Sequence, residues 1–191
     1  MSDLSEFDSI CPYNDEEAVE ALHKVANHPA VLPISEYLFP DEKVTYLRDA
    51  LKQVNSIDEF QEAVMNKAVN WCIDHTIHNF SYDGISYIKG MKGKFVAMSN
   101  HRDIILDPAI TQAVFFRNGI PLTEICVGDN LIKQSKTVEY LLRSNRMIKV
   151  IRGISARELY LSSQVLSKYI RQTITSGKAS IWLAQRQGRT K

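Results

Sequence analysis

The 191-residue chain lacks long apolar runs, a secretory signal and clustered cysteines. Its first ten residues are acidic and have neither the basic stretch nor the apolar run that a signal peptide requires. Apolar runs such as 113–116 are far too short to span a bilayer, which takes roughly 20 residues. These absences predict a cytoplasmic protein whose membrane contact, if there is any, is peripheral and at the inner membrane face.

Cysteine is scarce and scattered. Cys11, Cys72 and Cys126 form no CxxC pair and have no histidine at metal-ligand spacing, so neither a disulfide framework nor a zinc site is indicated. We therefore expect no metal, no tightly bound cofactor and no nucleic-acid partner. With 45% hydrophobic and 24% charged residues, the chain has the composition of a globular protein with a substantial core.

Charge is distributed unevenly along the chain. Residues 1–62 contain four Lys or Arg against 14 Asp or Glu, a net charge of −10, whereas the remainder carries 19 basic against eight acidic residues, a net charge of +11. This asymmetry predicts that the second region binds anions, or that the acidic region docks on the basic one. The two interpretations are compatible.

The first 79 residues predict a small helical module. Acidic residues 15–17 and 41–42 each open a segment with apolar residues at helical spacing. Ser56 is a candidate N-cap with Glu59 as its capping-box partner, and the helix it opens carries Phe60 and Val64 on one face.

From residue 80 the pattern changes to alternating strands and helices. We expect a strand pair around the Asp83–Gly84 turn, strands at 94–99, 122–127, 148–151 and 179–183, and helices at 108–117, 137–144 and 156–175. This predicts an α/β fold in residues 80–191, a sheet flanked by helices. Because the last strand leads into a polar loop at 185–191, the sheet is expected to be incomplete at Lys191.

One candidate catalytic string follows the strand at 94–99. It reads Ser99-Asn100-His101, then Asp107-Pro108-Ala109-Ile110 after five intervening residues. A histidine can take a proton near neutral pH, and a carboxylate on its other ring nitrogen fixes the tautomer and stabilises the imidazolium. Asp107 before Pro108 could alternatively be only a helix N-cap.

The string resembles the first block of the glycerolipid acyltransferases, and its flanks are similar to those of the soluble glycerol-3-phosphate branch. In that family four residues separate His from Asp, so here the loop absorbs one more residue, or Asp103 takes the place of the aspartate. The resemblance implies His101 as general base and Asp107 as its orienting partner. The tripeptide at 101–103 also occurs in protein kinases, but Pro108 stands where their Asn is required and the glycine-rich loop is missing.

Two further blocks extend the resemblance over residues 80–191. The segment 148–153 resembles the block whose arginine binds the acceptor phosphate, which by position is Arg152; guanidinium groups grip phosphate through paired hydrogen bonds. Basic residues at 143, 146, 149, 152 and 157 could also be a solvated face. The segment 181–190 is similar to the Glu-Gly-Thr-Arg block, with Gln187 in place of Glu and with Gly188 and Arg189 as phosphate-binding candidates.

The resemblance implies an acyltransferase-like fold and an O-acyltransferase of phospholipid synthesis. The donor would be an acyl thioester on coenzyme A or acyl carrier protein, and the acceptor a phosphate-bearing glycerol. A non-catalytic relative that binds lipid or carrier protein, and an acyltransferase for a different lysolipid, are the alternatives.

Overall fold

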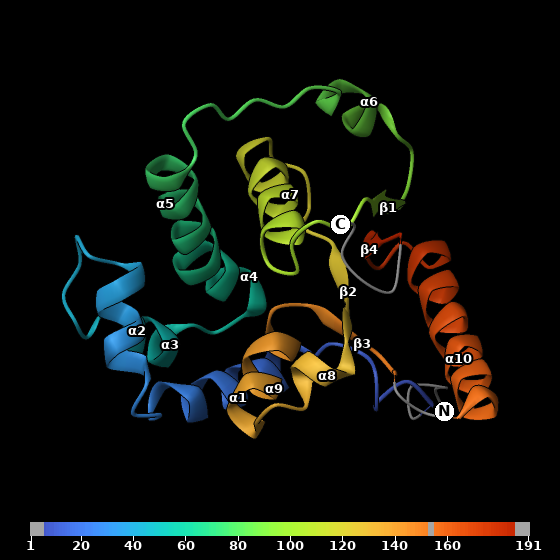
Figure 1. Ribbon diagram of the computed structural model, residues 1–191, viewed down its shortest axis with the longest axis horizontal. Coiled ribbons are helices and arrows are strands. Elements are labelled where there is room, and N and C mark those ends of the chain that lie inside the picture. Colours follow the sequence, from blue (N-terminus) through green and yellow to red (C-terminus); the bar gives the residue numbers. More distant parts are fainter. Residues whose placement is uncertain (1–5, 153–154, 186–191) are drawn as a thin grey trace.

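A computed structural model describes residues 6–152 and 155–185, which form an α/β structure (Figure 1). Its strands are β1 (Val96–Ser99), β2 (Glu124–Gly128), β3 (Met147–Val150) and β4 (Ile181–Ala184). Its helices are α1 (Asp15–Ala26), α2 (Val31–Leu38), α3 (Tyr46–Gln53), α4 (Ile57–Phe60), the π-helix η2 (Gln61–Asn66), α5 (Lys67–Thr76), α6 (Ile85–Gly90), α7 (Leu106–Arg117), α8 (Asp129–Ile132), α9 (Lys136–Ser144) and α10 (Ala156–Thr175).

Within the described ranges, four parallel strands make one sheet in the order β1-β4-β2-β3. Figure 1 shows α10 on one side of the sheet and α7, α9 and the N-terminal helices on the other. Parallel sheets are stable when both faces are covered in this way. None of the helices in the described ranges is long and apolar enough to cross a bilayer.

Side-chain caps explain where several helices begin. Ser155 and Glu158 form a reciprocal capping box at the start of α10, as Asn14 and Glu17 do for α1. The predicted cap at Ser56 is confirmed, because its hydroxyl accepts the N–H of Glu59 at 3.1 Å. The Glu59 carboxylate accepts the backbone N–H of Asn55. The expected capping box with Ser56 is therefore replaced by a bond to the residue before the cap.

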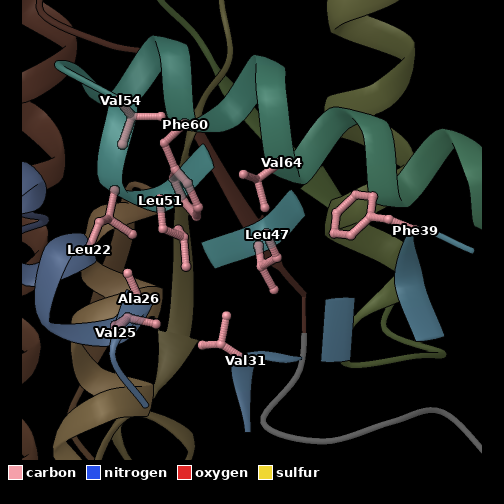
Figure 2. Close-up of a cluster of buried hydrophobic side chains, with 10 residues drawn as sticks. All are labelled: Leu22, Val25, Ala26, Val31, Phe39, Leu47, Leu51, Val54, Phe60 and Val64. Carbon is pink, nitrogen blue, oxygen red and sulfur yellow. The ribbon is translucent and has the colours of Figure 1, made fainter. Parts of the chain in front are cut away.

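The N-terminal helices enclose a core of ten buried apolar side chains (Figure 2). Phe60, Leu22 and Leu51 are fully buried at its centre, where α1, α3 and α4 meet. Tyr140 and Leu141 of α9 pack against the same cluster. Residues from before and after position 80 therefore share this core, which fixes the helical region against the sheet.

A second core lies under α10. Phe7 and Ile10, from the segment before α1, pack with Ile148 of β3, Tyr169 of α10 and Ile181 of β4. The backbone N–H of Lys149 donates to the carbonyl of Ile10 at 2.8 Å, so the N-terminal segment runs beside β3.

Ion pairs join the acidic region to the basic region. Asp58 pairs with Arg146, and Glu6 pairs with Lys168. This arrangement supports the interpretation that the acidic part docks on the basic part. Exposed pairs of this kind contribute little stability each, commonly about 0–1 kcal/mol.

The predicted strand pair at 80–88 is wrong. Residues 77–84 have no regular structure, and α6 follows directly. Gly84 adopts φ +81°, a left-handed conformation that suits glycine and starts the helix. Ile85 and Ile88 are three residues apart, which places them on one helix face but on opposite faces of a strand. Helix α3 begins at Tyr46 rather than at residues 41–42, so its predicted start is wrong. Helices α2 and α8 were not predicted.

Candidate active site

The candidate residues lie at the carboxyl edge of the sheet. His101 follows β1, Gly128 ends β2, and Arg152 follows β3. Because the strands are parallel, these ends meet one edge, where α/β folds form their sites. The order β1-β4-β2-β3 nevertheless places β1 and β3 three strand spacings apart, about 14 Å.

The loop after β1 brings His101 and Asp107 together, as the sequence predicts. His101 Nδ1 lies 3.3 Å from Asp107 Oδ2, and the two side chains are only 13% and 21% exposed. The same oxygen accepts the backbone N–H groups of Arg102 and Asp103 at 2.7 and 2.9 Å. The loop therefore folds around the carboxylate, and this accommodates the additional residue.

Asp107 does not occupy the N-cap position. Helix α7 begins at Leu106 with Ile105 as N-cap, so Asp107 lies inside the first turn, where a negative charge is favourable. Asp103 instead satisfies the start of the helix, because its carboxylate accepts the N–H groups of Ile105 and Leu106 at 2.8 and 2.7 Å. The two aspartates thus have different local partners.

An apolar cavity of about 240 Å³ lies beside this loop. Its walls come from η2, α5, α7, α9 and the sheet, and Ile104, Ile105, Pro108 and Ala109 bring the His101–Asp107 loop and the start of α7 into the lining. Ile105 is also 68% exposed at the surface. The cavity wall and the His–Asp pair therefore belong to one continuous stretch of chain.

The polar side chains in the lining are bonded to other protein groups. Gln61 donates to Asn145 and accepts from Arg146, at 3.1 and 2.9 Å. Gln112 makes two 2.9 Å hydrogen bonds with Thr123. Apolar cavities of about 150 Å³ stay dry and bind small hydrocarbons, so a hydrocarbon chain is the ligand that suits this lining.

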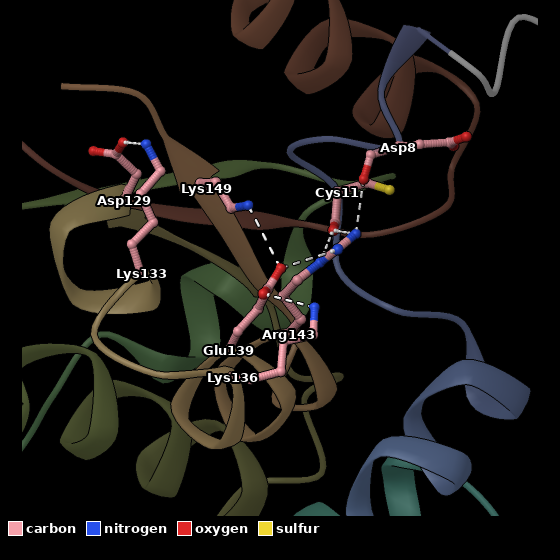
Figure 3. Close-up of polar contacts among 8 residues, drawn as sticks. All are labelled: Asp8, Cys11, Asp129, Lys133, Lys136, Glu139, Arg143 and Lys149. Carbon is pink, nitrogen blue, oxygen red and sulfur yellow. Dashed lines mark hydrogen bonds and ion pairs between the residues drawn. The ribbon is translucent and has the colours of Figure 1, made fainter. Parts of the chain in front are cut away.

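Arg152 lies against the end of β2. A Cβ placed on Gly128 would come within 3.2 Å of Arg152 Nε and 3.3 Å of its Cζ, so the glycine allows the guanidinium to approach the backbone. The backbone N–H of Arg152 donates to the buried Asp129 at 3.0 Å. Figure 3 shows Asp129 also bonded to Lys133. Burial acts to raise the pKa of Asp129, but the hydrogen bonds from Lys133 and the Arg152 backbone outweigh it and hold the pKa below its usual range.

Other basic residues near this strand have structural partners. Arg143 donates to the carbonyls of Asp8 and Cys11, and both Arg143 and Lys149 pair with Glu139 (Figure 3). These two cations therefore hold the N-terminal segment and α9 beside β3. Arg143 and Lys149 are therefore not part of a purely solvated basic face, which was the alternative interpretation of their spacing.

Several predicted site residues lie outside the described residues. Gly188, Arg189 and Gln187 belong to the segment 186–191, and the prediction that they converge with Arg152 on one phosphate pocket stays a prediction.

The sequence reasoning missed two parts of this edge. Asp129, whose carboxylate accepts the backbone N–H of Arg152, could have been recognised from the sequence, because it comes two residues after the predicted strand at 122–127, at the carboxyl end where sites form. The cavity carried no such signal, because its lining combines residues from 61 to 147.

No protein-family model matches the chain, and no curated protein is significantly similar to it. The resemblance to glycerolipid acyltransferases therefore depends on the motif residues themselves. In the described part of the chain, no group of three or more His, Cys, Asp or Glu side chains is arranged to hold a metal ion.

Proposed function

We propose that the protein is an O-acyltransferase. It would move a fatty acyl group from an acyl thioester, on coenzyme A or acyl carrier protein, to a hydroxyl of glycerol-3-phosphate or 1-acylglycerol-3-phosphate. One observation carries the proposal: the His101–Asp107 pair shares its loop with the wall of a cavity that suits a hydrocarbon chain. A base beside an alkyl-binding cavity is the arrangement that acyl transfer to an alcohol needs.

The pair would perform the proton transfers. With Asp107 on Nδ1, His101 is held in the tautomer whose Nε2 accepts the proton of the acceptor hydroxyl. The hydroxyl oxygen attacks the thioester carbonyl, and a C–O bond forms as the C–S bond breaks. The imidazolium then returns its proton to the departing thiolate. Asp107 stabilises the imidazolium between these steps, and no residue is acylated.

The remaining parts of the site would bind the substrates. The apolar cavity takes the acyl chain and so holds the thioester carbonyl near His101. Arg152, whose guanidinium lies at the same sheet edge, binds the acceptor phosphate through charge-assisted hydrogen bonds. The fold implied by the resemblance is acyltransferase-like, with the further residues of the phosphate site in the segment 186–191.

A lipid-binding relative without catalysis is the second candidate. The same cavity favours it, since binding a hydrocarbon chain requires neither His101 nor an acceptor. Two departures from the pattern of the acyltransferase family also favour a non-catalytic relative. Five residues rather than four separate His101 from Asp107, and Gln187 stands in place of Glu. An acyltransferase for a lysolipid without glycerol phosphate is a third reading, in which Arg152 would matter less.

A transfer assay separates these candidates. The full-length natural protein is incubated with acyl-coenzyme A or acyl carrier protein donors and with glycerol-3-phosphate, 1-acylglycerol-3-phosphate or monoacylglycerol, which carries no phosphate. Thiol release and the acylated product are measured together, with acceptor-free reactions to subtract thioester hydrolysis. We expect acceptor-dependent product with a phosphate-bearing glycerol. Acyl-chain binding without product would favour the lipid-binding relative, and product only with monoacylglycerol would favour the third reading.

A further inference from the structure

Helix α6 carries large apolar side chains into solvent. It has no buried residue, and Figure 1 shows it lying out from the rest of the molecule, joined to α5 and β1 by extended chain. Tyr87 is 79% exposed and Met91 is 54% exposed. On β1, which is an edge strand, Met98 is 62% exposed. Single exposed apolar residues are ordinary, but here three occur within residues 87–98.

The same stretch is purely basic. Residues 84–102 contain Lys89, Lys92, Lys94 and Arg102 and no Asp or Glu. Among the described residues, no ion pair involves the three lysines. Elsewhere in the molecule the acidic region neutralises basic groups such as Arg146 and Lys168, whereas no acidic side chain in the described part of the chain pairs with these three lysines.

We propose that this stretch, called here the α6 surface, binds an anionic phospholipid bilayer; it comprises Tyr87, Lys89, Met91, Lys92, Lys94 and Met98. Tyrosine and methionine side chains enter the headgroup region, while lysines reach anionic headgroups with their stems along the apolar boundary. Each lysine near such a surface contributes about 1 kcal/mol, so binding is reversible and depends on salt.

The shape of the α6 surface favours a bilayer over a protein partner. Binding hot spots between proteins usually sit in packed pockets, whereas α6 projects as a convex tip without buried residues. A fluid interface can surround such a tip without a complementary groove. Membrane binding by the α6 surface does not require acyltransferase activity. Ile105 nevertheless connects the cavity with the molecular surface, because it lines the cavity and is also exposed in the loop after β1.

Vesicle binding tests the proposal. The full-length protein is sedimented with vesicles of pure phosphatidylcholine and with vesicles that also contain phosphatidylglycerol, over a range of salt concentrations. We expect binding only to the anionic vesicles, weakening as salt rises. Lys89→Ser with Lys92→Ser should lower the partition coefficient about 30-fold, because two lysines are removed. Tyr87→Ser with Met91→Ser should lower it at every salt concentration.

Matched controls isolate the α6 surface. Lys43→Ser with Lys52→Ser removes two exposed lysines from the N-terminal region, and Tyr37→Ser removes a tyrosine that is 74% exposed. These variants should bind vesicles as the wild type does. Equal loss in the control variants, or no binding to anionic vesicles, would overturn the proposal.

Two other occupants of the α6 surface would also overturn it. One is a second copy of the chain, which would appear as a doubled mass in light scattering that Tyr87→Ser abolishes. The other is an acidic protein such as acyl carrier protein, bound in place of vesicles and lost in the Lys89→Ser, Lys92→Ser variant. The acyltransferase proposal can fail separately. In that case no transfer to soluble glycerol-3-phosphate would be observed, while vesicle binding would be unchanged.

Discussion

Oδ2 of Asp107 contacts Nδ1 of His101 at 3.3 Å and also accepts the backbone N–H groups of Arg102 and Asp103. One carboxylate oxygen thus closes the loop and orients the imidazole. Five residues separate the histidine from the aspartate, and the loop still brings their side chains together. The orienting role can therefore be tested by removing the charge of Asp107 while keeping its size.

Asp107→Asn should lower kcat on the order of 10²- to 10⁴-fold with little change in Tm. The amide oxygen can still accept the backbone N–H groups, but it does not stabilise an imidazolium or select the productive tautomer. Asp103→Asn, which can still accept from Ile105 and Leu106, serves as the matched control and should cost less than about tenfold. A larger loss in Asp103→Asn than in Asp107→Asn would transfer the orienting role to Asp103.

Arg152→Ala should raise the KM for the acceptor about 10- to 100-fold and leave the KM for the donor nearly unchanged. The substitution removes a charge-assisted hydrogen bond to phosphate, which is worth about 1.5–3 kcal/mol. Steady-state kinetics with each substrate varied in turn measure the two effects. Arg157→Ala, on the exposed start of α10, controls for the loss of one positive charge nearby. Equal effects on donor and acceptor would show that Arg152 does not hold the phosphate.

Ala109→Leu should shift the donor preference toward shorter acyl chains. Ala109 lines the apolar cavity, and a leucine there removes the volume of about three methylene-sized groups from the space for the chain. The ratio of kcat/KM for long- and short-chain thioesters reports the change. Ala156→Leu adds the same volume on the surface at the start of α10 and should leave the ratio unaltered. An unchanged ratio in Ala109→Leu would place the acyl chain elsewhere.

We expect the folded protein to lose stability at alkaline pH because of Tyr169. Burial, the charge of Glu124 and the 2.6 Å hydrogen bond that Tyr169 donates to Glu124 raise its pKa well above the usual value. The folded state therefore keeps the proton that the unfolded state loses above about pH 10, and the free energy of unfolding should fall by up to about 1.4 kcal/mol per pH unit there.

Urea unfolding of the wild type and of Tyr169→Phe from pH 8 to 11 measures this dependence. The variant should be less stable at neutral pH, because the buried Glu124 loses a donor, but its stability should fall less steeply above pH 10. Equal slopes would exclude a contribution from Tyr169.

Local signals in the sequence predicted much of the α/β region. Helix α10 has the predicted bounds because its apolar periodicity is long and its start is capped by Ser155. The strands at 94–99 and 148–151 were found within two residues, because each is a short apolar run. The first was expected to be buried and is not, since β1 is an edge strand with Val96 and Met98 exposed. Helix α6 was mispredicted because the Asp83–Gly84 pair indicates a hairpin turn, although the three-residue spacing of Ile85 and Ile88 fits a helix and not one face of a strand.

The site was predictable only where it is local in sequence. His101 and Asp107 are six positions apart on one loop, so their contact could be anticipated from the motif. The cavity could not, because it forms only when η2 packs against α7 and the sheet. The position of Arg152 against Gly128 likewise depends on the pairing of β2 with β3, which the chain does not encode locally.

The most direct test of the central claim is the turnover of His101→Ala. If His101 is the general base, the full-length variant should keep its fold, measured by circular dichroism and Tm, and should lose at least about 10²- to 10⁴-fold in kcat for acyl transfer. The His101 side chain lies in a loop and contributes little to either core, so a folding defect is not expected. Near-wild-type turnover in a folded His101→Ala protein would contradict the mechanism.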